Sequence, residues 1–154
     1  FLKMLHKSIG FPAVTLRFFL VYGPNQKLNR LIPFTIHNCI QNNTFNVSQG
    51  DQIRDFCYID DAVDGIIAAM FEDKSNGEII NIASGEPVSV KDVILKVQKK
   101  IGQGTPCFGK YVSETLENPV LYADIKKAKK ILNWVPKIRL LDGLDKTISF
   151  YQSG

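Results

Sequence analysis

Apolar residues follow two alternating patterns along this chain, short unbroken runs and stripes at helical spacing. The runs 13–21 and 78–83 are mostly apolar and rich in β-forming residues. Such runs are typical of strands buried on both faces of a parallel sheet. Shorter strands are expected at 45–47 and 54–58, with turns between them.

Apolar residues at helical spacing predict helices over the segments between these runs. Ser89 is a candidate N-cap, and the expected helices are 31–40, 90–101 and 140–151. A further helix is expected from Asp124 to Leu132. Strands alternate with helices, so the sequence predicts an α/β fold.

The helix expected after the strand at 54–58 is capped by Asp60 or Asp61. Its apolar residues are predicted to face the core: Val63, Ile66, Ile67, Met70 and Phe71. Adjacent carboxylates could also suggest a metal site or a catalytic pair. Capping and the positive end of the helix dipole explain them better, so no metal ligand is predicted.

The first residues suggest a fragment of a longer protein. Residues 1–7 resemble the tail of an amphipathic helix that Gly10 closes, although the chain begins with Phe1. A natural chain rarely begins inside a helix without a cap. Strands cut off from a larger sheet expose unpaired edges, so we expect a homodimer or completion of the sheet by upstream residues.

Composition narrows the class of protein. The chain has 154 residues, of which 45% are hydrophobic and 22% charged, as in a soluble globular protein. A net charge of +4 is too small to indicate nucleic-acid binding. No membrane span or secretory signal is visible, and the widely spaced cysteines Cys39, Cys57 and Cys107 favour a reducing cytoplasm over a disulfide framework.

Five stretches, in order, resemble the extended short-chain dehydrogenase/reductase family of NAD-dependent nucleotide-sugar epimerases and dehydratases. They span nearly the whole chain, and the third is the most specific. They are LRFFLVYGP (16–24), LIP (31–33), GDQIRDFCYIDD (50–61), INIASG (80–85) and ADIKKA (123–128), the last followed by LNWVP (132–136) and Gly143-Leu144.

The resemblance implies the C-terminal portion of such an enzyme. A Rossmann domain with NAD or NADP and a catalytic Tyr-x-x-x-Lys pair would lie upstream of Phe1, so no catalytic residue is predicted in this chain. Segments 13–24 and 59–85 would belong to the Rossmann sheet layer. Segments 25–58 and 86–154 would form a small, helix-rich substrate-binding lobe.

The resemblance also assigns roles to individual residues. Phe18 and Phe19 would lie by the nicotinamide end of the cofactor. The substrate, a nucleoside-diphosphate sugar, would be held by residues for its diphosphate, its base and its nucleoside. These are Arg30, Leu31 and Arg54 for the diphosphate, Val47 for the base and Asn81 for the nucleoside.

Arg54 is also open to a structural interpretation. A guanidinium offers a rigid fork of donors that matches phosphate oxygens. From its sequence context alone, however, Arg54 could equally form an ion pair with Asp55 or Asp60.

Two positions depart from the family pattern. Leu20 stands where many members have an Asn that contacts the diphosphate, and Glu114 stands where many have an Arg, three residues before Glu117. Lys110 is a nearby cation that could substitute. The intact protein is therefore expected to be a cytoplasmic nucleotide-sugar epimerase, dehydratase or reductase in carbohydrate metabolism, such as cell-surface polysaccharide biosynthesis. The alternative is a non-catalytic member that senses a dinucleotide or a partner.

Overall fold

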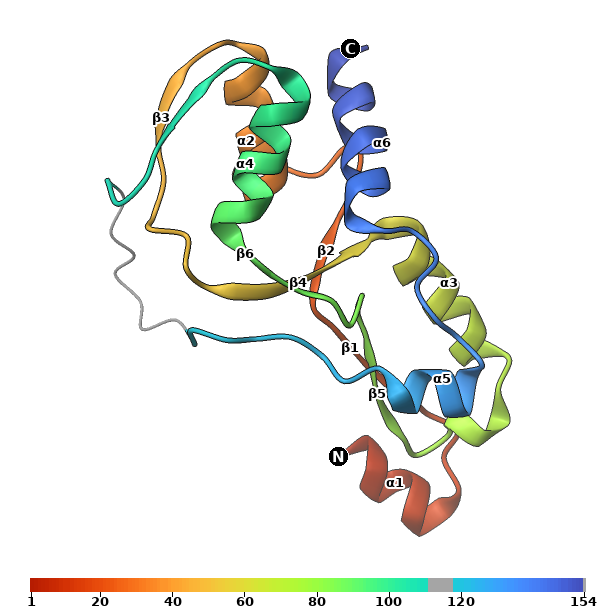
Figure 1. The fold of residues 1–154 in the computed structure, drawn as a ribbon. Helices are drawn as coiled ribbons and strands as arrows, with labels where there is room; N and C mark the ends of the chain where they lie inside the picture. The colour runs from red at the N-terminus through yellow and green to blue at the C-terminus, as the bar shows by residue number, and fades with distance from the viewer. Residues whose placement is uncertain (111–117, 154) are drawn as a thin grey trace. The chain divides into compact units, whose positions relative to one another are not determined.

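The computed structural model describes residues 1–110 and 118–153, which form two compact units (Figure 1). Unit 1 comprises residues 1–21, 55–86 and 122–139. Unit 2 comprises residues 22–54, 87–121 and 140–154, of which 111–117 and 154 lie outside the described residues. The assignment of segments to a Rossmann layer and a lobe stays a prediction.

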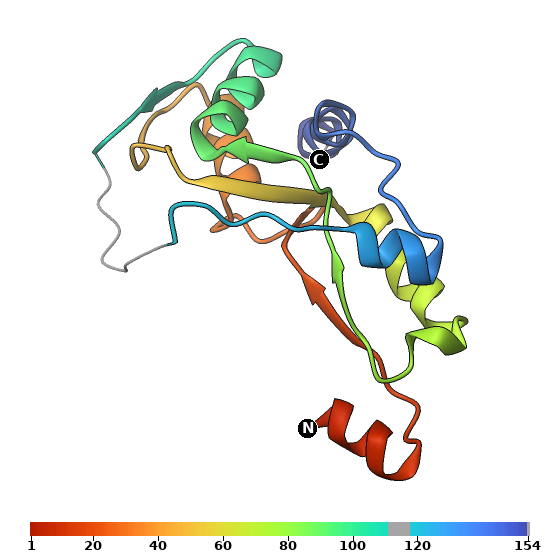
Figure 2. The ribbon, with the colours of Figure 1, turned by 60° about the horizontal axis from the view of Figure 1, so that its bottom comes forward.

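Unit 1 contains a pair of parallel strands. β1 (Thr15–Phe18) pairs with β5 (Ile79–Ile82), with Thr15 opposite Ile79 and Phe18 opposite Ile82. Both views show these strands side by side (Figures 1 and 2). The predicted run 13–21 is interrupted at Phe19, after which β2 (Leu20–Tyr22) begins.

The helices of unit 1 lie close to the predicted positions. They are α1 (Leu2–Ile9), α3 (Ile59–Met70) and α5 (Lys126–Leu132), with a short 3₁₀ helix at Asp73–Ser75. Gly10 ends α1 at φ 69°, which is the left-handed conformation expected of a glycine after a helix.

In its described residues, unit 2 contains three helices, α2 (Leu31–Ile40), α4 (Val90–Ile101) and α6 (Leu140–Gln152), which pack on one another. The bounds of α2 and α4 are those predicted. Ser89 is the N-cap of α4, and its Oγ accepts a hydrogen bond from the Asp92 backbone N–H at 3.0 Å. This bond is the local reason why α4 begins at Val90.

Short strands complete the fold. β3 (Thr44–Asn46) pairs in parallel with β7 (Thr105–Cys107), a strand that is absent from the sequence prediction. β2, β4 (Ile53–Tyr58) and β6 (Pro87–Ser89) form a sheet in the order β2-β4-β6. β7 was missed because its pairing with β3 joins residues about 60 positions apart, a relation that local sequence does not encode.

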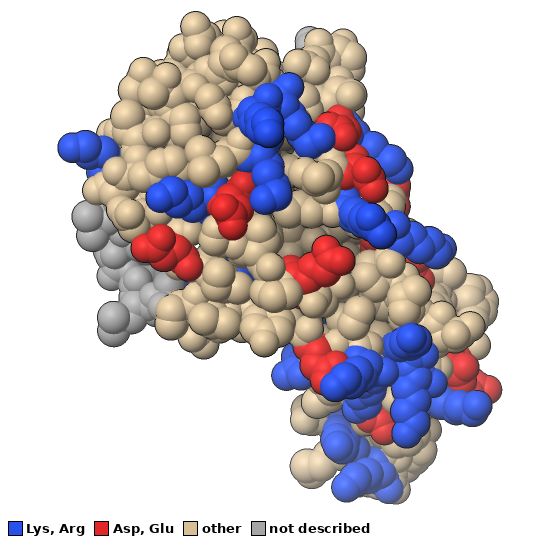
Figure 3. Space-filling model, in the orientation of Figure 1, with Lys and Arg blue, Asp and Glu red and all other residues tan. Residues whose placement is uncertain are grey.

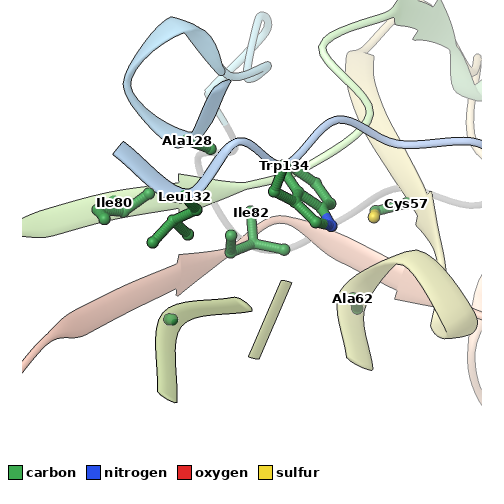
Figure 4. Close-up of a cluster of buried hydrophobic side chains, with 8 residues drawn as sticks. Cys57, Ala62, Ile80, Ile82, Ala128, Leu132 and Trp134 are labelled. Atoms are coloured by element: carbon green, nitrogen blue, oxygen red, sulfur yellow. The ribbon is translucent and has the colours of Figure 1, made fainter. Parts of the chain in front are cut away.

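The core of unit 1 is built around Trp134 (Figure 4). The indole is 4% exposed, and its Nε1 donates a hydrogen bond to the Asp61 carbonyl oxygen at 3.1 Å. Gly65 of α3 lies close to the ring, because a Cβ on Gly65 would be 3.3 Å from Trp134 and 3.1 Å from Ile82. The other buried members of this cluster are Cys57, Ala62, Ala69, Ile80, Ala128 and Leu132.

The predicted orientation of α3 is wrong. The large residues expected to face the core are exposed, from 39% for Ile66 to 83% for Phe71. The buried residues are Asp61, Ala62, Gly65 and Ala69. Because Gly65 and the two alanines are small, this face of α3 can approach Trp134 and Ile82 closely, which the large residues would prevent.

The thiols of Cys39 and Cys57 are buried. Burial raises the pKa of Cys39 from 9.0 to about 11. Burial, followed by the negative charges of Asp61 and Asp55, raises the pKa of Cys57 from 9.0 to about 12. Both cysteines therefore stay protonated at neutral pH, and thiolates are the reactive form.

We expect a thiol reagent at pH 8 to label Cys107, which is partly exposed, much faster than Cys39 and Cys57. Mass spectrometry of the labelled chain measures this, and all three should label in urea. Equal labelling of all three folded thiols would contradict the burial.

The raised pKa of Cys57 also predicts how the stability of the fold depends on pH. Because the folded pKa of Cys57 is raised, the stabilising contribution of its protonated thiol is complete below pH 9 and is lost as the pH rises toward 12. Cys57→Ala should therefore reduce the loss of unfolding free energy at alkaline pH.

Two further observations concern charged residues at the surface and the apolar length of the helices. The lysines of α5 are exposed, and Figure 3 shows basic side chains gathered over α5 and α1. Among the described residues, no helix is long and apolar enough to cross a membrane.

Candidate functional site

Three of the predicted ligand residues lie where β1 and β5 end. Phe18 is the last residue of β1 and is 42% exposed. Phe19 follows it, and its backbone N–H donates to the Ile82 carbonyl oxygen at 3.4 Å. Asn81 lies on β5 opposite Arg17. Ligands of open parallel sheets bind at the carboxyl ends of the strands, and unit 1 brings these three residues to that end.

The side chain of Asn81 is held by protein groups. Arg17 Nε donates to Asn81 Oδ1 at 3.0 Å, and Asn81 Nδ2 donates to the Asp124 carbonyl oxygen at 3.1 Å. Asn81 therefore ties β5 to β1 and to the segment before α5. Sequence patterns do not reveal the Arg17 contact, because residues 64 positions apart meet only through strand pairing.

Asp55 accepts four hydrogen bonds within unit 1, a role that was not predicted. It is fully buried. Its Oδ1 accepts from the Ser84 backbone N–H and Oγ, both at 2.7 Å. Its Oδ2 accepts from the backbone N–H groups of Gly85 at 2.9 Å and Ala123 at 3.3 Å. One carboxylate thus fastens the loop after β5 and the segment before α5 to β4.

Arg54, the neighbouring residue on β4, belongs to unit 2. It is 9% exposed, and its Nη1 donates to the carbonyl oxygens of Ile53 and Asn118, each at 2.9 Å. These bonds fix one end of the guanidinium near Asn118. Two residues further on, Val120 forms an isolated parallel bridge with Ile53. A guanidinium held in this way keeps its orientation, as a phosphate-binding group requires.

The remaining predicted substrate residues also lie in unit 2. Arg30 is exposed and precedes the first residue of α2, Leu31. Val47 is 6% exposed and belongs to a hydrophobic cluster against which Leu31 packs. The structure brings Leu31 and Val47 into one cluster, so both have a packing role.

Gln52, which the sequence did not single out, has a polar atom without a partner. Its Oε1 is buried and accepts no hydrogen bond from the described residues. Its backbone carbonyl accepts from the Val90 N–H at 3.0 Å. A buried acceptor left without a partner costs free energy, because its lost hydration is not replaced by a hydrogen bond.

Of the positions that depart from the family pattern, Leu20 is half-buried at the start of β2. Lys110 is exposed, and its backbone N–H donates to the Val47 carbonyl oxygen at 3.2 Å. Glu114 and Glu117 lie outside the described residues.

Asp60 and Asp61 have a structural role in part different from the one predicted. The N-cap of α3 is Tyr58, and both aspartates lie in the first turn. Asp61 accepts from the backbone N–H groups of Lys137 at 2.8 Å and Ile138 at 2.9 Å, so it caps the segment after Trp134 instead of its own helix. Among the described residues, no cluster of His, Cys, Asp and Glu could hold a metal ion.

Residues 1–83 match the model of the NAD dependent epimerase/dehydratase family. The chain belongs to this family, as the five sequence stretches indicated.

Individual relatives agree with this assignment. The chain is 36% identical to an uncharacterised UDP-glucose epimerase, YtcB, of Bacillus subtilis, over 98% of the chain and 49% of the relative. It is 34% identical to a UDP-glucuronate 4-epimerase of Thermodesulfobacterium geofontis, over 94% of the chain and 45% of the relative. The chain spans about half the length of the curated relatives it matches.

Among solved structures, the chain resembles the UDP-glucuronic acid 4-epimerase from Bacillus cereus in complex with UDP-glucuronic acid and NAD. The two are 35% identical and superpose with a TM-score of 0.85, over 97% of this chain and 48% of the epimerase. The chain therefore has the α/β fold of part of an epimerase in this family.

Proposed function

We propose that this chain is the C-terminal, substrate-binding half of an NAD(P)-dependent nucleotide-sugar epimerase or dehydratase. The single observation that carries the proposal is the likeness to the Bacillus cereus enzyme, whose structure holds both UDP-glucuronic acid and NAD. The likeness covers nearly the whole of this chain. The nucleoside-diphosphate sugar of the present protein is expected to bind in the same part of the fold.

Each unit, taken by itself, carries groups that suit a part of such a ligand. Unit 2 supplies the oriented guanidinium of Arg54 and the exposed Arg30, both suited to a diphosphate. Unit 1 supplies the exposed ring of Phe18. Val47 is proposed to contact the base and Leu31 the diphosphate, and both belong to one hydrophobic cluster.

This chain would contact the cofactor only at the nicotinamide end of the cofactor. An exposed aromatic ring at the carboxyl end of parallel strands fits a flat nicotinamide, so Phe18 and Phe19 are the residues proposed to lie against it. When bound, NAD or NADP supplies hydride transfer. The residues of this chain hold and orient the sugar nucleotide, and the proton-transferring Tyr-x-x-x-Lys pair is expected in the other half.

We expect the 154-residue chain alone to show no turnover with any nucleotide-sugar, because the groups that transfer protons and bind most of the cofactor lie outside it. The measurement is NADH absorbance and product chromatography with UDP-glucose and UDP-glucuronic acid. The Bacillus cereus enzyme, assayed in parallel, is the positive control. NAD-dependent conversion by the isolated chain would contradict the proposal.

A non-catalytic sensor of the same fold remains the second candidate, and Leu20 favours it because an apolar side chain stands where a diphosphate contact is expected. Calorimetric titration of the longer protein with UDP-, CDP-, GDP- and dTDP-sugars separates the two. Binding of one sugar nucleotide supports the enzyme. Binding of NADP with no sugar nucleotide supports the sensor.

A further inference from the structure

One side of α3 carries an uninterrupted row of exposed apolar side chains, here called the α3 stripe. Its members recur at helical spacing, so they share one face: Ile59, Val63, Ile66, Ile67 and Met70. Their exposed fractions run from 37% for Ile59 to 71% for Met70, and Phe71, just beyond the helix, is 83% exposed. From Gly65 to Phe71 the sequence contains no charged residue.

The opposite face of α3 is also apolar. Ala62, Gly65 and Ala69 are buried against the core around Trp134. Apart from Asp60, Asp61 and Asp64 near its start, α3 is apolar over more of its circumference than the single stripe that is typical of a surface helix. The second face of α3 therefore needs a cover that unit 1 does not itself provide.

Other parts of unit 1 also leave apolar side chains or strand edges uncovered. α1 has no buried residue, although Met4 and Ile9 are apolar, and these two are 71% and 72% exposed. In the described residues, the sheet of β1 and β5 has only these two strands. Parallel sheets occur almost only in larger assemblies with helices on both faces. An isolated pair of strands is marginal.

We propose that the α3 stripe is the docking surface for the other half of the longer protein, which supplies the apolar surface that covers it. This inference rests on the proposed function. The length of the relatives identifies the occupant, because about half of each lies outside the match. A segment in the same polypeptide also has a high effective concentration, which favours it over a second copy of the chain.

A chimaera with a cleavable junction tests this docking. The matched part of the Bacillus subtilis relative is replaced by this chain, with a protease site at the junction, and the protein is cut after folding. We expect the two pieces to stay together through size-exclusion chromatography. Ile66→Glu and Ile67→Glu should weaken their association by about tenfold or more, because each buries a charge in an apolar contact. Leu95→Glu, on α4 of unit 2 and 40% exposed, is the matched control and should change it less than about twofold.

Two results would overturn the docking proposal. In one, the cut pieces separate at once, or the stripe variants behave like the control. In the other, sedimentation of the 154-residue chain shows a dimer. If Ile67→Glu abolishes this dimer and the other half does not displace it, a second copy of the chain is the occupant of the α3 stripe. Titration of the uncut chimaera with UDP-glucose tests the proposed function separately. Pieces that stay together in a chimaera that binds no sugar nucleotide would support the docking and contradict the function.

Discussion

Replacing Asp55 with Asn is expected to lower the free energy of unfolding by about 3 kcal/mol. The carboxylate accepts four hydrogen bonds, from Ser84 N, Ser84 Oγ, Gly85 N and Ala123 N. An Asn side chain keeps one oxygen, which can serve Ser84. Its amide group would then face two N–H donors that lose their acceptor. The loop after β5 and the segment before α5 should loosen together.

Urea unfolding followed by circular dichroism measures this loss of stability. Asp51→Asn is the matched control, since Asp51 is exposed and the same chemical change should cost less than about 0.5 kcal/mol there. Amide hydrogen exchange gives an independent reading, with faster exchange at Gly85 and Ala123 in the Asp55 variant. Equal stability of the two variants would show that the four bonds do not hold these segments.

Trp134→Ala is expected to cost about 3–5 kcal/mol, the range for deleting a large buried aromatic side chain. The indole is 4% exposed and lies against Ile82 and the bare face of Gly65. Its loss leaves a cavity between α3 and β5, and it also removes the hydrogen bond to the Asp61 carbonyl. The α3 stripe should become mobile with the helix.

Circular dichroism is again the measure, because the variant lacks the only tryptophan of the chain. Val135→Ala provides the neighbouring control, since Val135 is 42% exposed and little stability should depend on it. If Trp134→Ala and Val135→Ala were equally stable, the packing of α3 on this core would not be a main source of stability in unit 1.

The predicted ligand residues illustrate how far sequence reasoning reached. Phe18 and Phe19 are assigned to the cofactor by the family resemblance; they lie at the carboxyl end of a parallel pair, and their contact with a cofactor stays a prediction. Asn81 was assigned in the same way, yet its amide bonds Arg17 and Asp124. A motif identifies a position, but it does not show which partners the side chain finds.

Local sequence by itself determined where the helices α2 and α4 run, because helical spacing and a cap are properties of neighbouring residues. It also determined the α/β class and the family. Only the tertiary structure decided which side of α3 is buried, because both faces are apolar and the choice depends on the fit of Gly65 against Trp134. The pairing of β3 with β7 and the four donors around Asp55 were likewise decided there, because each joins residues far apart in the sequence, and local periodicity carries no information about such contacts.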